Sequence, residues 1–236
     1  MKKDIFLILG TLLLITLITF SSALSITPQT KSQIIVPDLN QPAEFELTIS
    51  GSSGTHSIYT LSDVKILPSQ FTLVQGTSQK IRAFVYPTSS LTEKGFYTFT
   101  YNINADLEKL YTGKFTVKIM DLKDLFEINS DSNNLDTGAM KFYIKNKENT
   151  NLNNIKIEFS SIFFKDIQKT LNFEPYEKKE IEVLVDKEEL KTIAAGSYLI
   201  NAEIETKNGK EKIDGTIFLG EKKEITAEED ISGFLI

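Results

Sequence analysis

The sequence predicts an all-β protein that contains two tandem β-sandwich domains. Apolar and polar residues alternate along short segments, which is the pattern of half-buried strands, and helical periodicity is nearly absent. Clusters of Gly, Asn, Ser and Pro separate these segments at intervals of roughly 8 to 12 residues, which is typical of a sandwich. The second half of the chain also repeats the apolar pattern of the first half, which indicates two copies of one fold.

The first element is an apolar segment at the N-terminus. Lys2 and Lys3 precede an apolar run over residues 5–20, and the small residues 21–23 follow it. This layout is typical of a secretory signal cleaved after Ala23. The alternative is an uncleaved membrane anchor helix, although its length of about 24 Å is short for a bilayer core of about 30 Å. Residues 1–23 therefore predict a signal peptide or anchor, and an exported protein that is extracellular or on the outer face of the cytoplasmic membrane.

Alternating segments then follow one another to residue 219. Each has apolar residues at every second position, as expected for strands with one buried face. Asn208-Gly209 is the strongest hairpin signal, because both residues tolerate the positive φ of a type I′ turn. The apolar sets are Phe45, Leu47 and Ile49; Ile81, Ala83 and Val85; Phe115, Val117 and Ile119; Ile155, Ile157 and Phe159; Ile181, Val183 and Val185; and Ala202 with Ile204.

The internal repeat sets the predicted domain boundaries. Ile81 aligns with Ile181, Gly95 with Gly196, and the offset reaches only 102 between Gly113 and Gly215. We therefore expect domains at residues 24–120 and 121–222, each close to the size of an immunoglobulin-like sandwich of about 100 residues. Residues 223–236 form an acidic linker with an apolar end, which is either a frayed terminus or the start of a further module or anchor.

Composition excludes several functional classes. The chain has no Cys and a single His, which argues against thiol chemistry, thiolate metal sites and a Ser-His-Asp enzyme. The formal net charge is −6 and no basic stripe is present, which argues against nucleic-acid binding. We expect no catalytic, cofactor-binding or metal-binding residues.

Two individual motifs could carry chemistry but have simpler interpretations. His56 lies in a small polar loop with no nearby acid in the sequence, and we expect an exposed hairpin residue. Asp131, Asn133 and Asp136 resemble a calcium loop, but the sixth-position glycine and the distal glutamate are missing. Turn formation explains the same residues.

The repeated Gly-x-Tyr motif has a structural interpretation. Gly95 precedes Tyr97, and Gly196 precedes Tyr198, at the start of corresponding strands. A tyrosine there can bury its ring and donate its hydroxyl hydrogen to nearby backbone, as in a tyrosine corner. We expect these four residues to stabilise the fold.

Aromatic residues supply the candidate interaction sites. Phe163 and Phe164 break the alternation, so that either a bulge absorbs the mismatch or one ring contacts a partner. Tyr143 is a third candidate. Sugar binding commonly uses a flat exposed aromatic residue, and because the chain has no Trp, this role would fall to tyrosines on one face. The candidates are Tyr59, Tyr86, Tyr111 and Tyr143.

Residues 68–76, 79–82 and 95–99 resemble the prokaryotic immunoglobulin-like modules of the NEW3 type. Residues 175, 179–185 and 195–198 are similar to the same broad group or to the related adhesion-type modules. Such modules occur in archaeal and bacterial envelope proteins, including S-layer-associated ones. The resemblance implies a non-enzymatic spacer, adhesion or interaction protein. Its partners would be an envelope protein, further domains of the same polypeptide or a surface glycan, and the membrane if the N-terminal segment is uncleaved. The alternative is an accessory, carbohydrate-binding module of an extracellular enzyme or larger surface protein.

Overall fold

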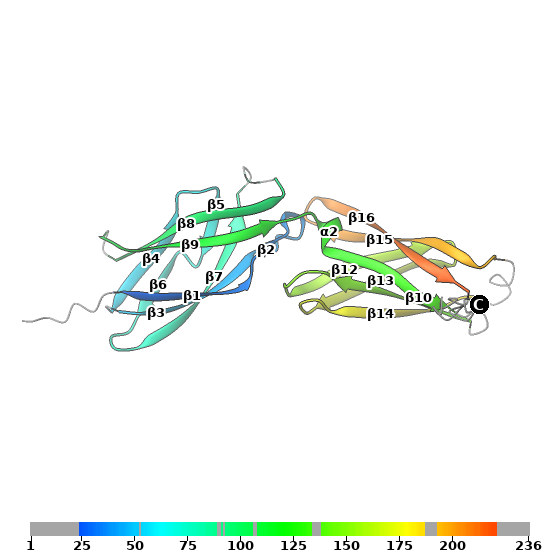
Figure 1. Ribbon diagram of the computed structural model, residues 1–236, viewed down its shortest axis with the longest axis horizontal. Coiled ribbons are helices and arrows are strands. Elements are labelled where there is room, and N and C mark those ends of the chain that lie inside the picture. The colour runs from blue at the N-terminus through cyan, green and yellow to red at the C-terminus, as the bar shows by residue number, and fades with distance from the viewer. Residues whose placement is uncertain are drawn as a thin grey trace, which may run out of the picture. The chain divides into compact units, whose positions relative to one another are not determined.

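The computed structural model describes residues 24–51, 53–88, 91, 93–105, 108–133, 138–186 and 193–220. The expected signal or anchor helix at 1–23 and the acidic linker at 223–236 lie outside these residues. Most described residues are in strands and very few are helical, which confirms the all-β class (Figure 1). Within the described part, no helix is both long and apolar enough to cross a membrane.

The chain divides into two compact units. Among the described residues, unit 1 comprises those within 24–33, 42–91 and 96–117, and unit 2 comprises those within 34–41, 93–95 and 118–220. The sequence placed a single division at residue 120. The structure instead assigns the short segment 34–41 to unit 2, although it precedes most of unit 1 in the sequence.

Unit 1 is built from two sheets. Its strands are β1 (Ser25–Ser32), β3 (Ala43–Ser50), β4 (Gly54–Thr60), β5 (Val64–Leu67), β6 (Gln70–Leu73), β7 (Ser78–Pro87), β8 (Gly95–Ala105) and β9 (Glu108–Ile119). One sheet has the order β1-β3-β7-β5, and the other has the order β2-β9-β8-β4-β6, in which β2 (Ile34–Ile35) pairs in parallel with the end of β9. The chain changes sheet between β5 and β6.

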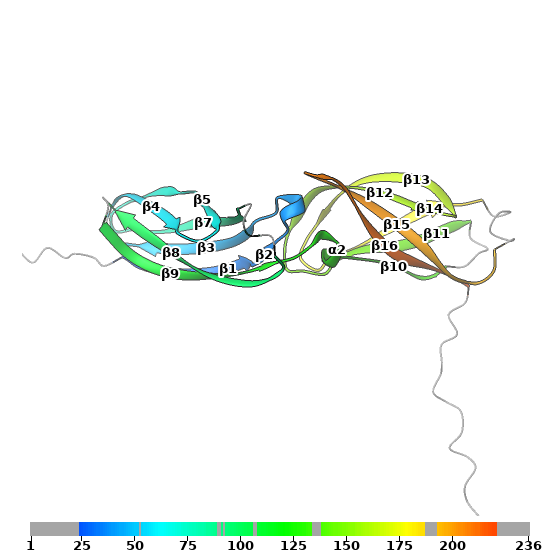
Figure 2. The same cartoon turned by 90° about the horizontal axis from the view of Figure 1, so that it is seen from above.

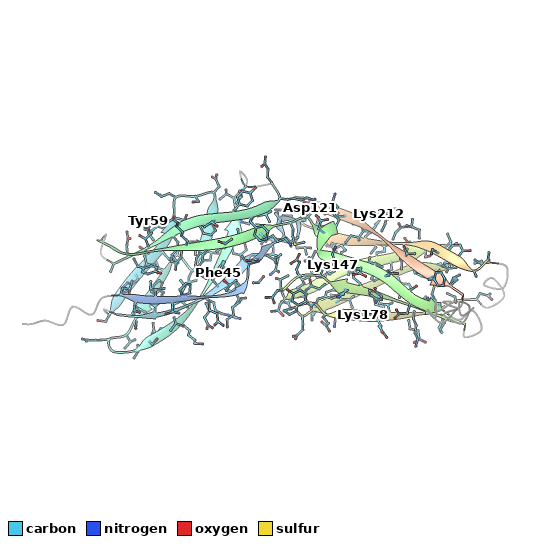
Figure 3. All side chains as sticks on the ribbon, in the orientation of Figure 1. Phe45, Tyr59, Asp121, Lys147, Lys178 and Lys212 are labelled. Atoms are coloured by element: carbon cyan, nitrogen blue, oxygen red, sulfur yellow. The ribbon has the colours of Figure 1, made fainter. Side chains whose placement is uncertain are left out.

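Aromatic rings join the two sheets of unit 1. Phe45 (Figure 3) lies on β3. Its ring stacks on Phe115 of β9 with ring centroids 4.1 Å apart, and Tyr101 on β8 stacks on Phe115 at 4.1 Å. Of the other residues predicted to face inward on the strands of this unit, Ile81 is partly buried. The remaining ones are almost fully buried: Leu47, Ile49, Ala83, Val85, Val117 and Ile119. Burial of this apolar surface is the main stabilising term of the unit.

Unit 2 contains a sheet of seven strands in the order β13-β12-β15-β16-β10-β11-β14 (Figure 2). The strands are β10 (Phe126–Asn133), β11 (Ala139–Asn146), β12 (Leu152–Ser161), β13 (Phe164–Phe173), β14 (Lys178–Leu184), β15 (Gly196–Thr206) and β16 (Gly209–Leu219). The first half of β10 pairs with β11, and its second half pairs in parallel with β16. Phe142 on β11 contacts Phe159 on β12 with centroids 5.2 Å apart, so the two halves of the sheet face each other across a core.

Short segments from elsewhere in the chain complete unit 2. The turn η1 (Pro37–Leu39) and the one-turn helix α2 (Leu122–Leu125) both belong to it. Ile34, Val36 and Leu122 are buried in the same core as the strands. The join between the predicted domains is therefore part of the core of unit 2.

The structure also corrects two predicted turns. The hairpin at Asn208-Gly209 is present, but its two loop residues are Lys207 and Asn208, and Thr206 pairs with Gly209. Of the two predicted turn residues, Gly209 alone has a positive φ, at 128°. Asp131 and Asn133, expected in a turn, belong to β10 because that strand continues along β16.

Candidate functional site

The Gly-x-Tyr residues support the strands that they begin. Tyr198 on β15 donates its hydroxyl hydrogen to the carbonyl of Ala194 at 2.6 Å, and its ring contacts Phe163 at 4.9 Å. Tyr97 is half-buried at the matching place on β8. Gly95 has a φ of 139°, which favours glycine, whereas a Cβ at Gly196 would make only an ordinary contact, 3.8 Å from the Tyr198 ring.

Phe163 and Phe164 lie within unit 2. Phe163 is in the turn between β12 and β13 and is buried against Tyr198, and Phe164 stacks on Phe142 at 5.8 Å. The pairing of β12 with β13 shifts register near Ser161, and this irregularity absorbs the break in alternation. Ile162, which is 71% exposed, is the outward residue of this turn. The contacts favour the structural interpretation over partner binding.

Tyr143 is engaged by neighbours in unit 2. Its hydroxyl donates to Oε1 of Glu127 at 2.8 Å, and the Lys178 ammonium lies 4.1 Å from its ring centroid. Burial and the hydrogen bond to Glu127 raise the pKa of Tyr143 to about 12. These contacts give it a role in holding β10, β11 and β14 together.

The four tyrosines proposed for sugar binding do not form one patch. Tyr59 lies on the outer face of β4, Tyr86 on β7 of the other sheet, and Tyr143 in unit 2. Tyr111 lies beside the buried Tyr101, with ring centroids 6.0 Å apart. Only Tyr59 is classed among the exposed large side chains, at 37% exposure.

His56 is buried, and the prediction of an exposed hairpin residue is wrong. It lies on β4, its side chain is 0% exposed, and its ring stacks on Phe71 at 5.5 Å. Nδ1 is 3.0 Å from the carbonyl oxygen of Gly54, and Nε2 has no hydrogen-bond partner in the described part of the chain. The alternation that buries Ile58 also points His56 inward, because the two residues are two positions apart.

Asn133 of the suspected calcium loop is a buried cross-link between strands. Its Nδ2 donates to the carbonyl of Lys141 at 2.9 Å, and its Oδ1 accepts from the Lys141 N–H at 2.5 Å. Asp136 lies outside the described residues. No group of three or more potential metal-binding side chains is present among the residues that the structure covers.

A groove of about 200 Å³ runs over the outer face of β12, β13, β15 and β16. Ion pairs cross it: Lys156 contacts Glu205 at 3.1 Å, and Lys210 contacts Glu158 at 2.5 Å and Glu203 at 3.2 Å. The hydrogen bonds to Glu158 and Glu203 raise the pKa of Lys210. These charges satisfy one another within the unit.

The outer face of sheet β1-β3-β7-β5 in unit 1 is similarly ionic. Arg82 contacts Glu44 at 2.9 Å, and Glu46 contacts Lys80 at 2.9 Å and Lys31 at 3.8 Å. The hydrogen bond from Lys80 lowers the pKa of Glu46. Paired charges of this kind are typical of a solvated sheet face.

The other sheet of unit 1 presents a different outer face, which we call the neutral face. Its outward side chains are mostly hydroxyls and amides, and they alternate with the buried residues of β4, β6, β8 and β9. Up to Thr116 on β9, Lys114 is the one charged residue among the outward side chains that the structure describes, and Lys118, the next outward residue of β9, is paired with Glu148 at 2.6 Å. The neutral face consists of Thr55, Ser57, Tyr59, Gln70, Thr72, Phe96, Thr98, Thr100, Asn102, Asn104, Thr112, Lys114 and Thr116.

Cross-strand contacts order the neutral face. Tyr59 pairs with Asn102, and Ser57 pairs with Asn104. Asn104 donates its Nδ2 hydrogen to the Tyr59 hydroxyl at 3.3 Å, and Thr112 donates to Oδ1 of Asn102 at 3.1 Å. This face is the candidate functional site, because its composition differs from the ionic faces described above.

The neutral face was not predicted from the sequence, although the polar residues of its strands contain a signal for it. The polar partners of Phe99, Tyr101 and Ile103 are Thr98, Thr100, Asn102 and Asn104. Reading the polar half of each alternating strand, as well as its apolar half, would have shown a run without charges.

Comparisons with known proteins identify no family. No family model matches the chain, and no curated protein matches it. Solved structures align with low overall similarity. A protein of unknown function from Porphyromonas gingivalis W83 is 9% identical with a TM-score of 0.28, covering 82% of this chain and 99% of that one. A chimeric titin Z1Z2 is 14% identical with a TM-score of 0.33, covering 86% and 99%. An ICAM-5 D1–D4 ectodomain fragment is 8% identical with a TM-score of 0.33, covering 83% and 50%.

Proposed function

We propose that this is a non-enzymatic, exported protein of a prokaryotic cell envelope, with two tandem immunoglobulin-like domains that serve as spacer and interaction modules. The main observation in support of this proposal is that the two units have similar cores but different outer faces. They share inward-facing residues and close-packed glycines, whereas their outer faces differ in chemistry.

Strand order supports an immunoglobulin-like assignment. Lettered along the chain as A to G, strands β1, β3, β4, β5, β7, β8 and β9 place A, B, E and D in one sheet and C, F and G in the other. This is the arrangement of a constant-type immunoglobulin domain. Strands β2 and β6 are additions to it. In unit 2, the order β12-β15-β16 places the matching C, F and G strands side by side.

The shared features of the two units are structural. Phe99, Tyr101 and Ile103 on β8 are buried, as are Ile200, Ala202 and Ile204 on β15. By contrast, the corresponding outward residues are neutral in unit 1 and ionic in unit 2. A repeat that keeps its core and varies its surface is suited to contacting different partners through one scaffold.

Export follows from residues 1–23 and from the resemblance to NEW3-type modules. The test is to fractionate the native cells, measure the intact mass of the protein, and introduce photo-crosslinkers at Thr100 and, as a matched position on the ionic face, at Thr48. We expect the protein in the envelope or medium, with crosslinks to envelope components from Thr100. A cytoplasmic location would overturn the proposal.

The second candidate is an accessory module of a larger extracellular enzyme, and the neutral face is the observation that favours it. The same mass measurement separates the two functions. A chain that ends near residue 236 supports the envelope module, whereas a much larger polypeptide with a catalytic domain supports the accessory module.

A further inference from the structure

We propose that the neutral face of unit 1 binds an uncharged polysaccharide along the strands β4, β8 and β9. This inference rests on the proposed function, because it names the ligand class that an exported interaction module would contact. It is carried by the charge, order and hydrogen-bonding capacity of the face.

Charge distinguishes this face first. Asp, Glu, Lys and Arg make up 25% of the chain, and ion pairs between them lie on the opposite face of unit 1 and on the outer face of β12, β13, β15 and β16. On the neutral face, which ends on β9 at Thr116, Lys114 is the one charge among the outward side chains that the structure describes, and Lys118 beyond it is paired with Glu148. Soluble surfaces normally carry mixed charges for solubility, so a sheet face filled with Thr and Asn indicates contact with a polar ligand that has no charge.

The face is an ordered grid. Successive outward side chains on a strand are about 6.8 Å apart, and neighbouring strands are about 4.8 Å apart. Gln70 lies opposite Ser57, which lies opposite Asn104, so three strands align their polar side chains in one row. A linear chain of sugar rings, each with several hydroxyls, meets such a grid at regular intervals.

Hydrogen-bonding capacity also fits a polyhydroxylated ligand. Oδ1 of Asn104 is shielded from solvent and has no hydrogen-bond partner in the part of the chain that the structure describes. A buried acceptor without a partner is costly, and a sugar hydroxyl would donate to it once the neighbouring side chains move. The hydroxyls of Thr98 and Thr116 are 2.8 Å apart and can each donate and accept.

Aromatic rings complete the chemistry. Tyr59 is 37% exposed, and Phe96, further along the same face, is 66% exposed. The apolar face of a sugar ring packs on exposed aromatic rings, while its hydroxyls bond to surrounding polar groups.

A protein partner fits this face less well. Protein interfaces are enriched in Arg, Met and aromatic residues and depleted in Ser, and their centres are apolar. The centre of the neutral face is made by Thr100, Asn102 and Asn104. We therefore assign a glycan, and treat self-association as an outcome of the test.

The experiment is affinity electrophoresis of the full chain through gels that contain one polysaccharide each. The neutral probes are amylose, laminarin, mannan and the neutral polysaccharide fraction from the envelope of the native cells, and alginate is the charged probe. The test variants are Tyr59→Ala and Asn102→Ala. The matched control is Tyr86→Ala, which removes a half-buried tyrosine from the other sheet of the same unit. Thermal unfolding checks that each variant folds.

We expect a neutral probe to retard the wild type and the Tyr86→Ala variant equally. Tyr59→Ala should weaken retention on the order of tenfold, the effect of losing one aromatic contact. Absence of retention by every neutral probe, retention by alginate alone, or equal retention of Tyr59→Ala would overturn the assignment. Sedimentation that shows a dimer lost in Tyr59→Ala would also overturn it in favour of self-association. Each of these failures leaves the location and crosslinks of the envelope protein unchanged, so the proposed function is tested separately.

Discussion

At the residue scale, Gly113 and Gly215 occupy corresponding positions of the repeat, and both are closely packed by neighbouring residues. A Cβ on Gly113 would lie 2.6 Å from Cε1 of Tyr101, and a Cβ on Gly215 would lie 2.6 Å from the carbonyl oxygen of Ile128. Neither glycine has a positive φ, so it is space rather than backbone conformation that requires them. In both units, therefore, a neighbouring residue packs directly against the glycine backbone at the same position of the corresponding strand.

Replacing either glycine by alanine should destabilise its unit. Gly113→Ala and Gly215→Ala force a neighbour to move, and we expect each to lower the free energy of unfolding by about 1–3 kcal/mol. Gly196→Ala is the matched control, since its Cβ would have an ordinary contact distance. Chemical denaturation measures the differences, and equal midpoints for all three variants would contradict the close packing.

Tyr143 should lose its hydroxyl proton at a higher pH than an ordinary tyrosine. Its pKa is raised from 10.0 to about 12, so its neutral form is favoured in the folded state. The stabilisation is fully present below about pH 10 and is lost as the pH rises through about 12. The absorbance of tyrosinate, measured as the difference between wild type and Tyr143→Phe, should show this midpoint. In Glu127→Gln the midpoint should fall towards 10, since the carboxylate is removed; a midpoint already near 10 in the wild type would be inconsistent with the contact.

At the scale of elements, the turn between β12 and β13 separates two neighbouring apolar residues. Phe163 is 7% exposed and Ile162 is 71% exposed. Phe163→Ala should lower the free energy of unfolding by about 3 kcal/mol because it leaves a cavity beside Tyr198. Ile162→Ala should change it by less than about 0.5 kcal/mol. Thermal or urea unfolding compares them, and similar effects would show that the ring of Phe163 is not packed.

The strands were largely predictable from sequence, and the exceptions have physical causes. Alternation located β3, β9 and β12 because one face of each is buried, which fixes the period at two. Alternation cannot show which sheet a strand joins, so the change of sheet between β5 and β6 and the division of β10 between β11 and β16 were not predicted. The prediction for His56 was wrong because it relied on the neighbouring turn residues and not on the strand alternation. That alternation places His56 on the same side of the strand as Ile58, two residues later. The neutral face was missed because its signal lies in the polar residues.

At the scale of the whole molecule, the order of the sequence differs from the composition of the units. Ile34 and Val36 precede β3 of unit 1, yet both are buried in the core of unit 2 with Leu122 and Phe126. The backbone N–H of Lys207 also donates to the carbonyl of Asp38 at 3.2 Å. The segment 34–41 is thus a structural part of the second unit.

This arrangement predicts how the second unit responds to changes early in the chain. Val36→Ala removes buried apolar volume from the core of unit 2, and we expect a loss of about 2 kcal/mol in its free energy of unfolding. Hydrogen exchange of the full chain should show the greatest loss of protection in β15 and β16. Thr27→Ala is the control, because Thr27 is exposed on β1, and it should leave the protection of the amides in β15 and β16 unchanged. A fragment of residues 121–220 should be less protected than the same residues in the full chain, because it lacks Ile34, Val36 and Met120 from its core. Equal protection in fragment and full chain would mean that the predicted boundary at residue 120 is also the boundary of stability.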